Sequence, residues 1–509
     1  MVISVECFLL EGAPEGTLQN RIRQMVAEGI LAGRLRAGER MPSSRGLAAH
    51  LGVSRITVTL AYADLVADDY LRAEGRSGYF VSESAPQPSD FPPAGTRGTD
   101  SVDWGRMLGH RPPGAQLSRG KPRNWREFRY PFVYGQADPE LFDHANWRGC
   151  TMQALGQKDF ARMTDDQFEA DDPALLEYIA RHTLPRRGIL ARGDEILVTL
   201  GAQNALWLTA QLLLNQRRSA GMEEPGYPGL REILTQTRCR VQPVAVGAQG
   251  LDAESLPEGL DVLFCTPSHH CPTGTTMPLA ARHRLLEVAN ARGLLVVEDD
   301  YEFEISPDRA PLPALKSLDR EGRVIHVGSF SKSLFPGLRL GFLVGPEPFI
   351  REARALRATV LRHPPGLVQR AAAHFLSLGY YDAMLRRLTR AFARRRAVMI
   401  EAIRAEGLTI AGAVGDGGSS LWMRTPASVG ATDLAMALRA DSVLIEPGRA
   451  FFGDPTAEDG FYRIAYSSIT DDRIPEGVAR IARRIAAMSP RSRKGARAEL
   501  DSGLSGIWP

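Results

Sequence analysis

Apolar residues near the start of the chain recur every three or four positions, which is the spacing of one helix face. The pattern predicts a helix over residues 17–33, with Thr17 as its N-cap and Gly33 as its end. The apolar face of this helix consists of Leu18, Ile22, Met25, Val26 and Ile30.

Two further helices and a pair of strands are predicted directly after it. Ser43 or Ser44 caps the second helix, and Ser54 caps the third. The two helices are joined by Leu-Gly-Val-Ser, an arrangement typical of a helix-turn-helix. Residues 70–81 then read as two strands around a glycine-rich turn, which indicates a wing. We therefore predict a winged helix-turn-helix domain over residues 1–84.

The pattern changes in the larger part of the chain, residues 126–488. Short apolar runs typical of buried strands alternate there with amphipathic helical segments, which predicts an α/β domain with a largely parallel sheet. Residues 85–125, rich in Pro, Gly and Ser, predict a linker, and residues 489–509 predict a disordered tail. The clearest strand runs are I-L-V-T-L, V-L-F-C-T, L-L-V-V-E-D-D and V-I-H-V-G.

Composition narrows the class of protein. The chain has 509 residues, 44% hydrophobic and 24% charged, which are globular values that suggest several domains. No apolar run approaches the length of a membrane span, so we expect a cytoplasmic protein with no membrane partner. The five cysteines are scattered and contain no Cys-x-x-Cys pair, so neither a disulfide framework nor a metal site is predicted.

The net charge of +3 is too small to indicate nucleic acid binding, but basic residues cluster locally. Seven arginines and only two acidic residues lie between Arg21 and Arg55. In a helix-turn-helix the start of the third helix enters a major groove, so Arg55 would face the bases or the backbone while Arg45 meets phosphate and Arg76 reaches a neighbouring groove from the wing tip. The residues predicted to contact DNA are Arg45, Ser54, Arg55, Thr57, Thr59, Arg76 and Gly78.

Helical bundles with this pattern often bind nothing, so the order of residues matters. The stretch G-R-L-R-A-G-E-R-M-P-S-S-R-G-L-A-A-H-L-G-V-S-R-I-T-V, followed by R-S-G-Y-F-V in the wing, resembles the winged-helix domain of the GntR family. The resemblance implies binding to double-stranded operator DNA.

The chemistry of the larger domain centres on Lys332. It lies in a Ser- and Gly-containing loop between the apolar runs V-I-H-V and L-G-F-L-V, which read as buried strands. Burial lowers the pKa of a lysine and leaves a neutral amine that can attack an aldehyde and form an imine. The alternative is a lysine that reaches solvent and has no chemical role.

Other polar residues follow strand ends, where the functional residues of α/β sheets gather. Backbone amides of residues 201–203 open a helix and predict an anion site, with Arg339 as a second phosphate contact. E-D-D-Y presents carboxylates and a phenol after another strand, although Asp299 and Asp300 could instead cap a helix. A lysine, an anion site, a carboxylate and a hydroxyl donor together match pyridoxal 5′-phosphate.

The order and spacing of these motifs resemble fold-type I aminotransferases. The resemblance implies that Asp299 pairs with the pyridinium nitrogen, Tyr301 donates to the phenolic oxygen and Lys332 forms the imine. It also places Arg463 where the family binds a substrate carboxylate, although Arg463 could instead form an ion pair at a strand edge. The phosphate would be held by Gly201, Ala202, Gln203, Ser329 and Arg339.

A GntR-like winged helix followed by an aminotransferase-like domain resembles the MocR family of transcriptional regulators. The segments E-E-P-G-Y-P-G, T-P-S-H-H-C-P-T-G, E-D-D-Y and S-F-S-K-S-L-F-P-G-L-R-L-G resemble its motifs. They place Tyr227 near the cofactor and Cys271 where aminotransferases carry an asparagine that bonds the phenolic oxygen. A thiol is a weaker hydrogen-bond donor than an amide, so we expect no physiological turnover as an enzyme.

This resemblance implies a head-to-tail homodimer whose DNA-binding domains pack on the partner subunit. It also implies a small amine or amino-acid effector that exchanges with the imine at Lys332 and shifts operator binding. Two alternatives stay open: a working aminotransferase with an appended DNA-binding domain, and a protein that only binds the cofactor.

Overall fold

The computed structural model describes residues 3–9, 16–86, 102–108, 122–136, 138–167, 169–302, 304, 312–414, 418–454 and 456–489. The chain divides into two compact units, Met1–His110 and Arg111–Pro509. Most of the predicted linker 85–125 and nearly all of the predicted tail 489–509 lie outside the described residues. The boundaries of the predicted domains therefore stay predictions.

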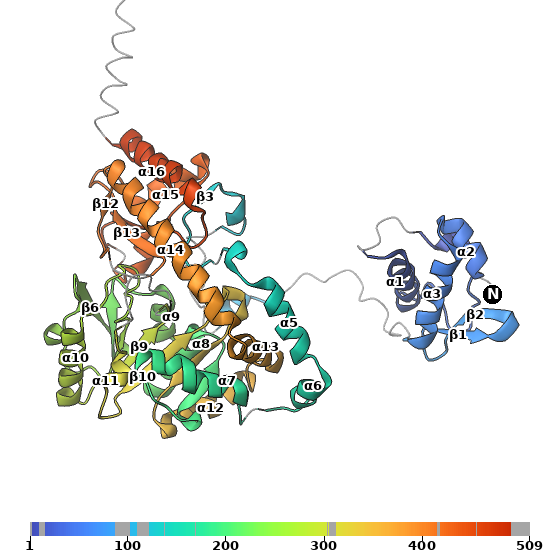
Figure 1. Cartoon of the computed structure of the whole chain (residues 1–509), viewed down its shortest axis with the longest axis horizontal. Helices are drawn as coiled ribbons and strands as arrows, with labels where there is room; N and C mark the ends of the chain where they lie inside the picture. Colours follow the sequence, from blue (N-terminus) through green and yellow to red (C-terminus); the bar gives the residue numbers. More distant parts are fainter. Residues whose placement is uncertain are drawn as a thin grey trace, which may run out of the picture. The chain divides into compact units, whose positions relative to one another are not determined.

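The N-terminal unit is a winged helix-turn-helix (Figure 1), as predicted. Its elements are α1 (Leu18–Leu31), α2 (Ser44–Leu51), α3 (Arg55–Ala67), β1 (Leu71–Glu74) and β2 (Gly78–Val81). Thr17, Ser43 and Ser54 are the N-caps, because each side-chain oxygen accepts a hydrogen bond from a backbone N–H of the first turn. The strands pair antiparallel, and fully buried Ile22 and Val58 belong to the core between the helices.

An eight-stranded sheet in the order β4-β11-β10-β9-β8-β5-β6-β7 forms the centre of the second unit. Among the described strands, four neighbouring pairs are parallel and three are antiparallel, so the sheet is mixed and less parallel than predicted. The main departure is the run after the Lys332 loop, which returns antiparallel to the strand before it. The strands are β4 (Ile196–Thr199), β5 (Ser219–Glu224), β6 (Arg240–Gly247), β7 (Gly250–Leu251), β8 (Val262–Cys265), β9 (Leu295–Asp300), β10 (Val324–Ser329) and β11 (Gly341–Val344).

Helices cover both faces of this sheet. Val297 belongs to the apolar cluster with residues of α8, α9 and α12, whereas Val296 belongs to the cluster with residues of α10 and α11. Successive residues of a strand point to opposite faces, so Asp299 lies on the side of Val297 and Asp300 on the side of Val296. These helices are α8 (Ala202–Leu213), α9 (Pro228–Thr237), α10 (Leu279–Arg292), α11 (Leu315–Leu318) and α12 (Glu347–Leu361).

A smaller antiparallel sheet, in the order β12-β13-β16-β15, forms the C-terminal lobe with α14, α15 and α16 (Figure 1). Its strands are β12 (Thr409–Ile410), β13 (Ser420–Arg424), β15 (Glu446–Pro447) and β16 (Phe461–Ala465). A separate pair joins β3 (Tyr130–Pro131) to β14 (Val443–Leu444). The helices of the lobe and its surroundings are α5 (His144–Ala154), α6 (Gln157–Met163), α7 (Pro173–Tyr178), α13 (Gly366–Ser377), α14 (Tyr380–Ala405), α15 (Ala431–Leu438) and α16 (Ile474–Met488).

Length and apolarity sufficient to cross a bilayer do not occur together in any helix of the described part of the chain.

Candidate functional site

A cavity of about 140 Å³ lies at the carboxyl ends of the central strands. All of the predicted cofactor-binding residues line it except Gly201, which lies beside it. Three further residues, Tyr134, Ser331 and Pro336, also line it. The complete lining is Tyr134, Ala202, Gln203, Tyr227, Cys271, Asp299, Tyr301, Ser329, Ser331, Lys332, Pro336 and Arg339.

Lys332 follows the end of β10 and reaches into this cavity. Its Nζ lies 4.3 Å from the centroid of the Tyr134 ring. The backbone of Gly135 approaches so closely that a Cβ there would lie 2.2 Å from the Nζ. Burial lowers the pKa of Lys332; Glu302 opposes this shift and Arg463 adds to it. Burial thus shifts the pKa of Lys332 in the direction that the sequence predicts.

One end of the cavity has the geometry of an anion site. Gly201 has a φ of +80° and precedes α8, and the first two residues of that helix, Ala202 and Gln203, line the cavity with N–H groups that have no acceptor within the helix. Arg339 donates to the carbonyl of Leu200 at 3.0 Å, and a Cβ added to Gly201 would meet its guanidinium at 3.2 Å. The buried hydroxyl of Ser331 has no partner among the described residues. A helix start, a guanidinium and a hydroxyl fit a phosphate.

At the end of β9, Asp299 faces the cavity with a buried Oδ1 that bonds to nothing in the described part of the chain. Burial raises its pKa from 3.8 to about 7, with further contributions from Asp300 and Glu223 and an opposing one from Lys332. A carboxyl in this state lacks a cationic partner. The protonated ring nitrogen of pyridoxal phosphate fits that requirement.

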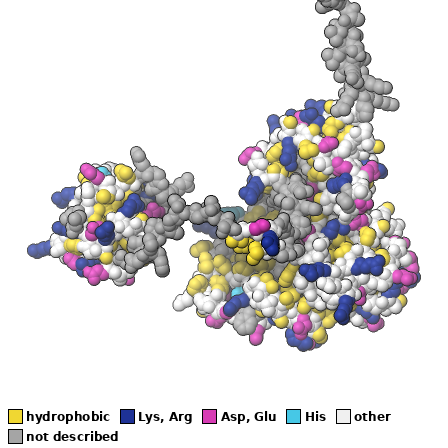
Figure 2. All heavy atoms as spheres, turned by 180° about the vertical axis from the view of Figure 1, so that it is seen from behind, with side chains coloured by type: hydrophobic (Ala, Val, Ile, Leu, Met, Phe, Trp, Pro, Cys, Tyr) yellow, Lys and Arg dark blue, Asp and Glu magenta, His cyan; other side chains and the backbone are white. Residues whose placement is uncertain are grey.

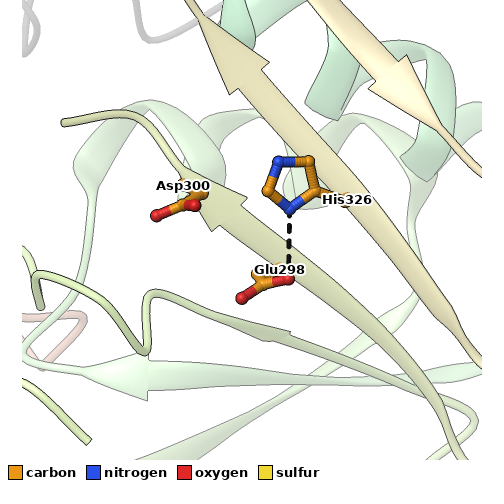
Figure 3. Close-up of side chains that lie close together, drawn as sticks. All are labelled: Glu298, Asp300 and His326. Carbon is orange, nitrogen blue, oxygen red and sulfur yellow. Dashed lines mark hydrogen bonds and ion pairs between the residues drawn. The ribbon is translucent and has the colours of Figure 1, made fainter. Parts of the chain in front are cut away.

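Figure 3 shows the neighbouring carboxylates of β9 beside His326 of β10. Asp300 forms a buried ion pair with Arg187 at 2.7 Å. Glu298 accepts hydrogen bonds from His326 at 3.1 Å and from two backbone N–H groups at the start of α11 at 2.8 and 3.1 Å. The three side chains lie close enough to surround a metal ion, but these bonds already engage both carboxylates. Asp299 is the β9 carboxylate that lines the cavity.

Tyr301 and Cys271 line the wall between the two lobes. The Tyr301 hydroxyl donates to the backbone carbonyl of His269 at 2.9 Å, and burial raises its pKa well above 10. Burial likewise raises the pKa of the Cys271 thiol to about 11, although Arg463 opposes the shift. Both groups therefore keep their protons at neutral pH.

Arg463 reaches the cavity wall from β16, and its Nη1 lies 3.7 Å from the Cys271 sulfur. Its guanidinium carbon lies 3.9 Å from the centroid of the Tyr134 ring. The same guanidinium is paired with Glu446 of β15, with Nε and Nη2 at 2.7 and 2.6 Å from Oε2. Arg463 therefore contacts residues of the cavity wall and forms an ion pair with the edge strand β15, and its role in binding an effector carboxylate stays a prediction.

Sequence reasoning missed Tyr134 and Glu446. Tyr134 lies in F-V-Y-G, nine residues after the end of the predicted linker and without any periodic pattern. Glu446 follows the short strand β14, and only its pairing with Arg463 connects it to the site. A tyrosine or acid in such short segments carries no sequence signal of its own.

In the N-terminal unit, most of the predicted DNA contacts are exposed. Arg55 and Thr59 lie on α3, and Arg45 lies in the first turn of α2. The hydroxyl of Thr57 is hydrogen bonded to that of Ser54 at 2.8 Å, so Thr57 stabilises the cap. Exposed Ile56, at 72%, adds an apolar side chain that the sequence prediction omitted.

The wing carries the other two predicted contacts. Arg76 is exposed between β1 and β2, and Gly78, with φ +103, opens β2. Basic and acidic side chains mix on the visible face of this unit in Figure 2, so its positive charge is local.

Two family models match the chain. Residues 18–81 match the bacterial regulatory proteins of the gntR family, and residues 164–481 match aminotransferase class I and II. The HTH-type transcriptional regulator TauR of Rhodobacter capsulatus is 57% identical over 95% of this chain and 99% of its own length. The probable rhizopine catabolism regulatory protein MocR of Rhizobium meliloti is 31% identical, over 88% of this chain and 90% of its own. The chain belongs to the MocR-type transcriptional regulators.

Membership in the MocR type confirms the predicted fold class and its two parts. The crystal structure of LysN, an α-aminoadipate aminotransferase from Thermus thermophilus complexed with N-(5'-phosphopyridoxyl)-L-leucine, matches with a TM-score of 0.67 and 28% identity. The matched region covers 76% of this chain and 99% of the LysN chain. The aminotransferase domain of this MocR-type chain implies dependence on pyridoxal phosphate, and its gntR domain implies DNA binding.

Proposed function

We propose that this MocR-type chain is a pyridoxal-phosphate-dependent transcriptional regulator that senses a small amine or amino acid at Lys332. One observation supports this most strongly: a lysine with a lowered pKa, a carboxyl without a partner and an anion site converge on one cavity. The gntR domain supplies DNA binding, and the second unit supplies the effector site.

Different residues around the cavity suit different groups of the cofactor. Arg339, Ser331 and the start of α8 suit the phosphate. Asp299 suits the ring nitrogen, and protonated Tyr301 suits the phenolic oxygen once it turns from its present carbonyl partner. Cys271 offers only a weak donor on that side.

Pyridoxal phosphate, when bound, supplies an aldehyde carbon that bonds reversibly to primary amines. Lys332 would hold that carbon in the resting protein, and its lowered pKa shifts the amine toward the neutral form that can bond to it. An effector amine that took the place of Lys332 would bring its own substituents toward Tyr134 and Arg463, because Lys332 and Arg463 both contact the Tyr134 ring. A contact made in only one state can shift the equilibrium between two arrangements of the protein.

We also propose a homodimer, with each DNA-binding domain packed on the partner's large domain. A hollow of about 630 Å³ lies beside the anion site. Apolar side chains dominate its walls, which supports a face that a second copy covers. The apolar residues among its lining are Leu200, Trp207, Ile233, Leu338, Pro365 and Val368.

Titration of a panel of primary amines tests the proposal, with cofactor absorbance and operator affinity followed in parallel. An amine that changes the absorbance is expected to change the dissociation constant for operator DNA by about 5- to 150-fold. Operator DNA must then change the affinity for that amine by the same factor. Amines that alter the absorbance but never operator binding contradict the regulatory role, and catalytic release of a keto acid favours a working aminotransferase. If no amine alters the absorbance, amine sensing is wrong.

A separate prediction concerns the roles of α2 and α3 in DNA binding. Arg45→Ala is expected to weaken binding to all sequences alike and to lower the salt dependence, because a phosphate contact releases counterions. Arg55→Ala is expected to relax sequence preference as well, at a cost of about 1–3 kcal/mol if the side chain reads a guanine. Fluorescence anisotropy with operator and random duplexes measures both.

Arg23→Ala is the matched control, because Arg23 is already paired with Asp68 at 2.8 Å on the outside of the same unit. Equal losses for operator and random DNA in the Arg55→Ala protein would place Arg55 on the backbone.

A further inference from the structure

The guanidinium of Arg463 is already paired with the carboxylate of Glu446. Two of its nitrogens, Nε and Nη2, lie 2.7 and 2.6 Å from the same carboxylate oxygen of Glu446. The strands that carry the two residues are neighbours, and Glu446 pairs directly with Arg463 in the β15/β16 register. The pair is therefore built into the sheet.

The pair has an inner and an outer member. The Arg463 side chain is only 6% exposed, whereas that of Glu446 is 28% exposed. Among the described residues, the third nitrogen, Nη1, has the Cys271 sulfur at 3.7 Å as its hydrogen-bond acceptor, which is a weak one, and the rings of Tyr134 and Phe451 flank the guanidinium. The guanidinium therefore lacks a strong hydrogen-bond acceptor at Nη1 among the described residues, while Glu446 occupies its edge at Nε and Nη2.

Arg463 and Lys332 contact the same aromatic ring. Both contact the ring of Tyr134, with Arg463 Cζ at 3.9 Å and Lys332 Nζ at 4.3 Å from its centroid. An effector whose amine took the place of the Lys332 amine would therefore bring an acid group at a suitable distance along the molecule toward Arg463 and the Glu446 carboxylate. Two anions beside one guanidinium repel each other across a partly buried site.

We infer that Glu446 is a specificity-determining residue for the effector: it competes with the effector's acid group for Arg463. The inference rests on the proposed function, because it concerns the same cavity. It assigns the effector to amines that carry an anionic group able to displace Glu446, and it explains how the site stays neutralised when no effector is bound.

Glu446→Gln tests the competition, because glutamine keeps the size and a hydrogen-bond acceptor but removes the charge. The probes are 3-aminopropanoate and propylamine, which differ only in the carboxylate, titrated into the full-length holoprotein and followed by cofactor absorbance. We expect the variant to bind 3-aminopropanoate at least about tenfold more tightly and propylamine within about twofold of the unchanged protein.

The ratio between the two amines is the decisive measurement. Glu446 also raises the pKa of Lys332, but that effect acts on both amines alike. Glu458→Gln is the matched control, because Glu458 pairs with Arg424 on the exposed side of the same small sheet at 3.2 Å. No change in the ratio, or equal changes for both amines, overturns the inference.

Propanoate, which has the acid group but no amine, separates this inference from the proposed function. Calorimetry is expected to detect at least about tenfold tighter binding of propanoate to the Glu446→Gln protein than to the unchanged protein. If the amines leave the absorbance unchanged but propanoate shows this gain, the proposed amine sensing is wrong and the competition at Arg463 stands. If propanoate binds both proteins equally, the competition is wrong.

Discussion

A Lys332→Ala protein is expected to lose the response to its effector completely while keeping operator binding and dimerisation. Lys332 lies at the cofactor cavity of the second unit, and the predicted DNA contacts all lie in the first. The unchanged protein should alter its operator affinity about 5- to 150-fold when the effector binds, which corresponds to a coupling of about 1–3 kcal/mol. In the variant, the effector should leave the operator affinity unchanged.

Two measurements check this result: operator affinity with and without the effector, and borohydride reduction followed by peptide mapping. Reduction should attach the cofactor to Lys332 in the unchanged protein and to no residue in the variant. Lys158→Ala, which changes an exposed lysine on α6, should behave like the unchanged protein in both. A Lys332→Ala protein that responds normally would show that sensing does not use this amine.

Asp299→Asn is expected to lower the affinity for the cofactor and to raise the stability of the cofactor-free protein. The pKa of Asp299 is raised to about 7, so without the cofactor its ionisation is unfavourable in the folded state. In the unfolded chain the carboxyl ionises near its usual value of 3.8, so this group lowers the stability as pH rises from about 4 to about 7. Asparagine removes that cost.

The cofactor-free Asp299→Asn protein should therefore be more stable than the unchanged one at pH 8, by about 1–3 kcal/mol, and nearly equal to it at pH 4. Its affinity for pyridoxal phosphate should fall at least about tenfold, because the ring nitrogen loses its counter-ion. Thermal unfolding at the two pH values and a cofactor titration measure these effects.

Asp300→Asn is the control for Asp299→Asn. Because Asp300 pairs with buried Arg187 at 2.7 Å, its replacement should destabilise the protein at both pH values. Loss of stability at pH 8 in the Asp299→Asn protein, with cofactor affinity unchanged, would move the ring-nitrogen role away from Asp299.

Much of the architecture could be predicted from local sequence. Ser43 and Ser54 cap their helices as predicted, because a cap depends on residues within one turn. Lys332, Asp299 and Gly201 could be selected because each follows an apolar strand run, and the central strands end at one edge of the sheet. These signals need no knowledge of how distant parts of the chain pack.

The tertiary structure alone decided how those residues are used. The alternation of β9 between two packed helix layers turned Asp299 to the cavity and Asp300 to Arg187, and the sequence could not say which layer lay on which side. Tyr134 and Glu446 meet Arg463 although they lie 329 and 17 residues away along the chain, because the segment after the linker and the small sheet close over the same cavity. Contacts of this kind depend on packing between separate elements, and short segments leave no periodic pattern from which to predict them.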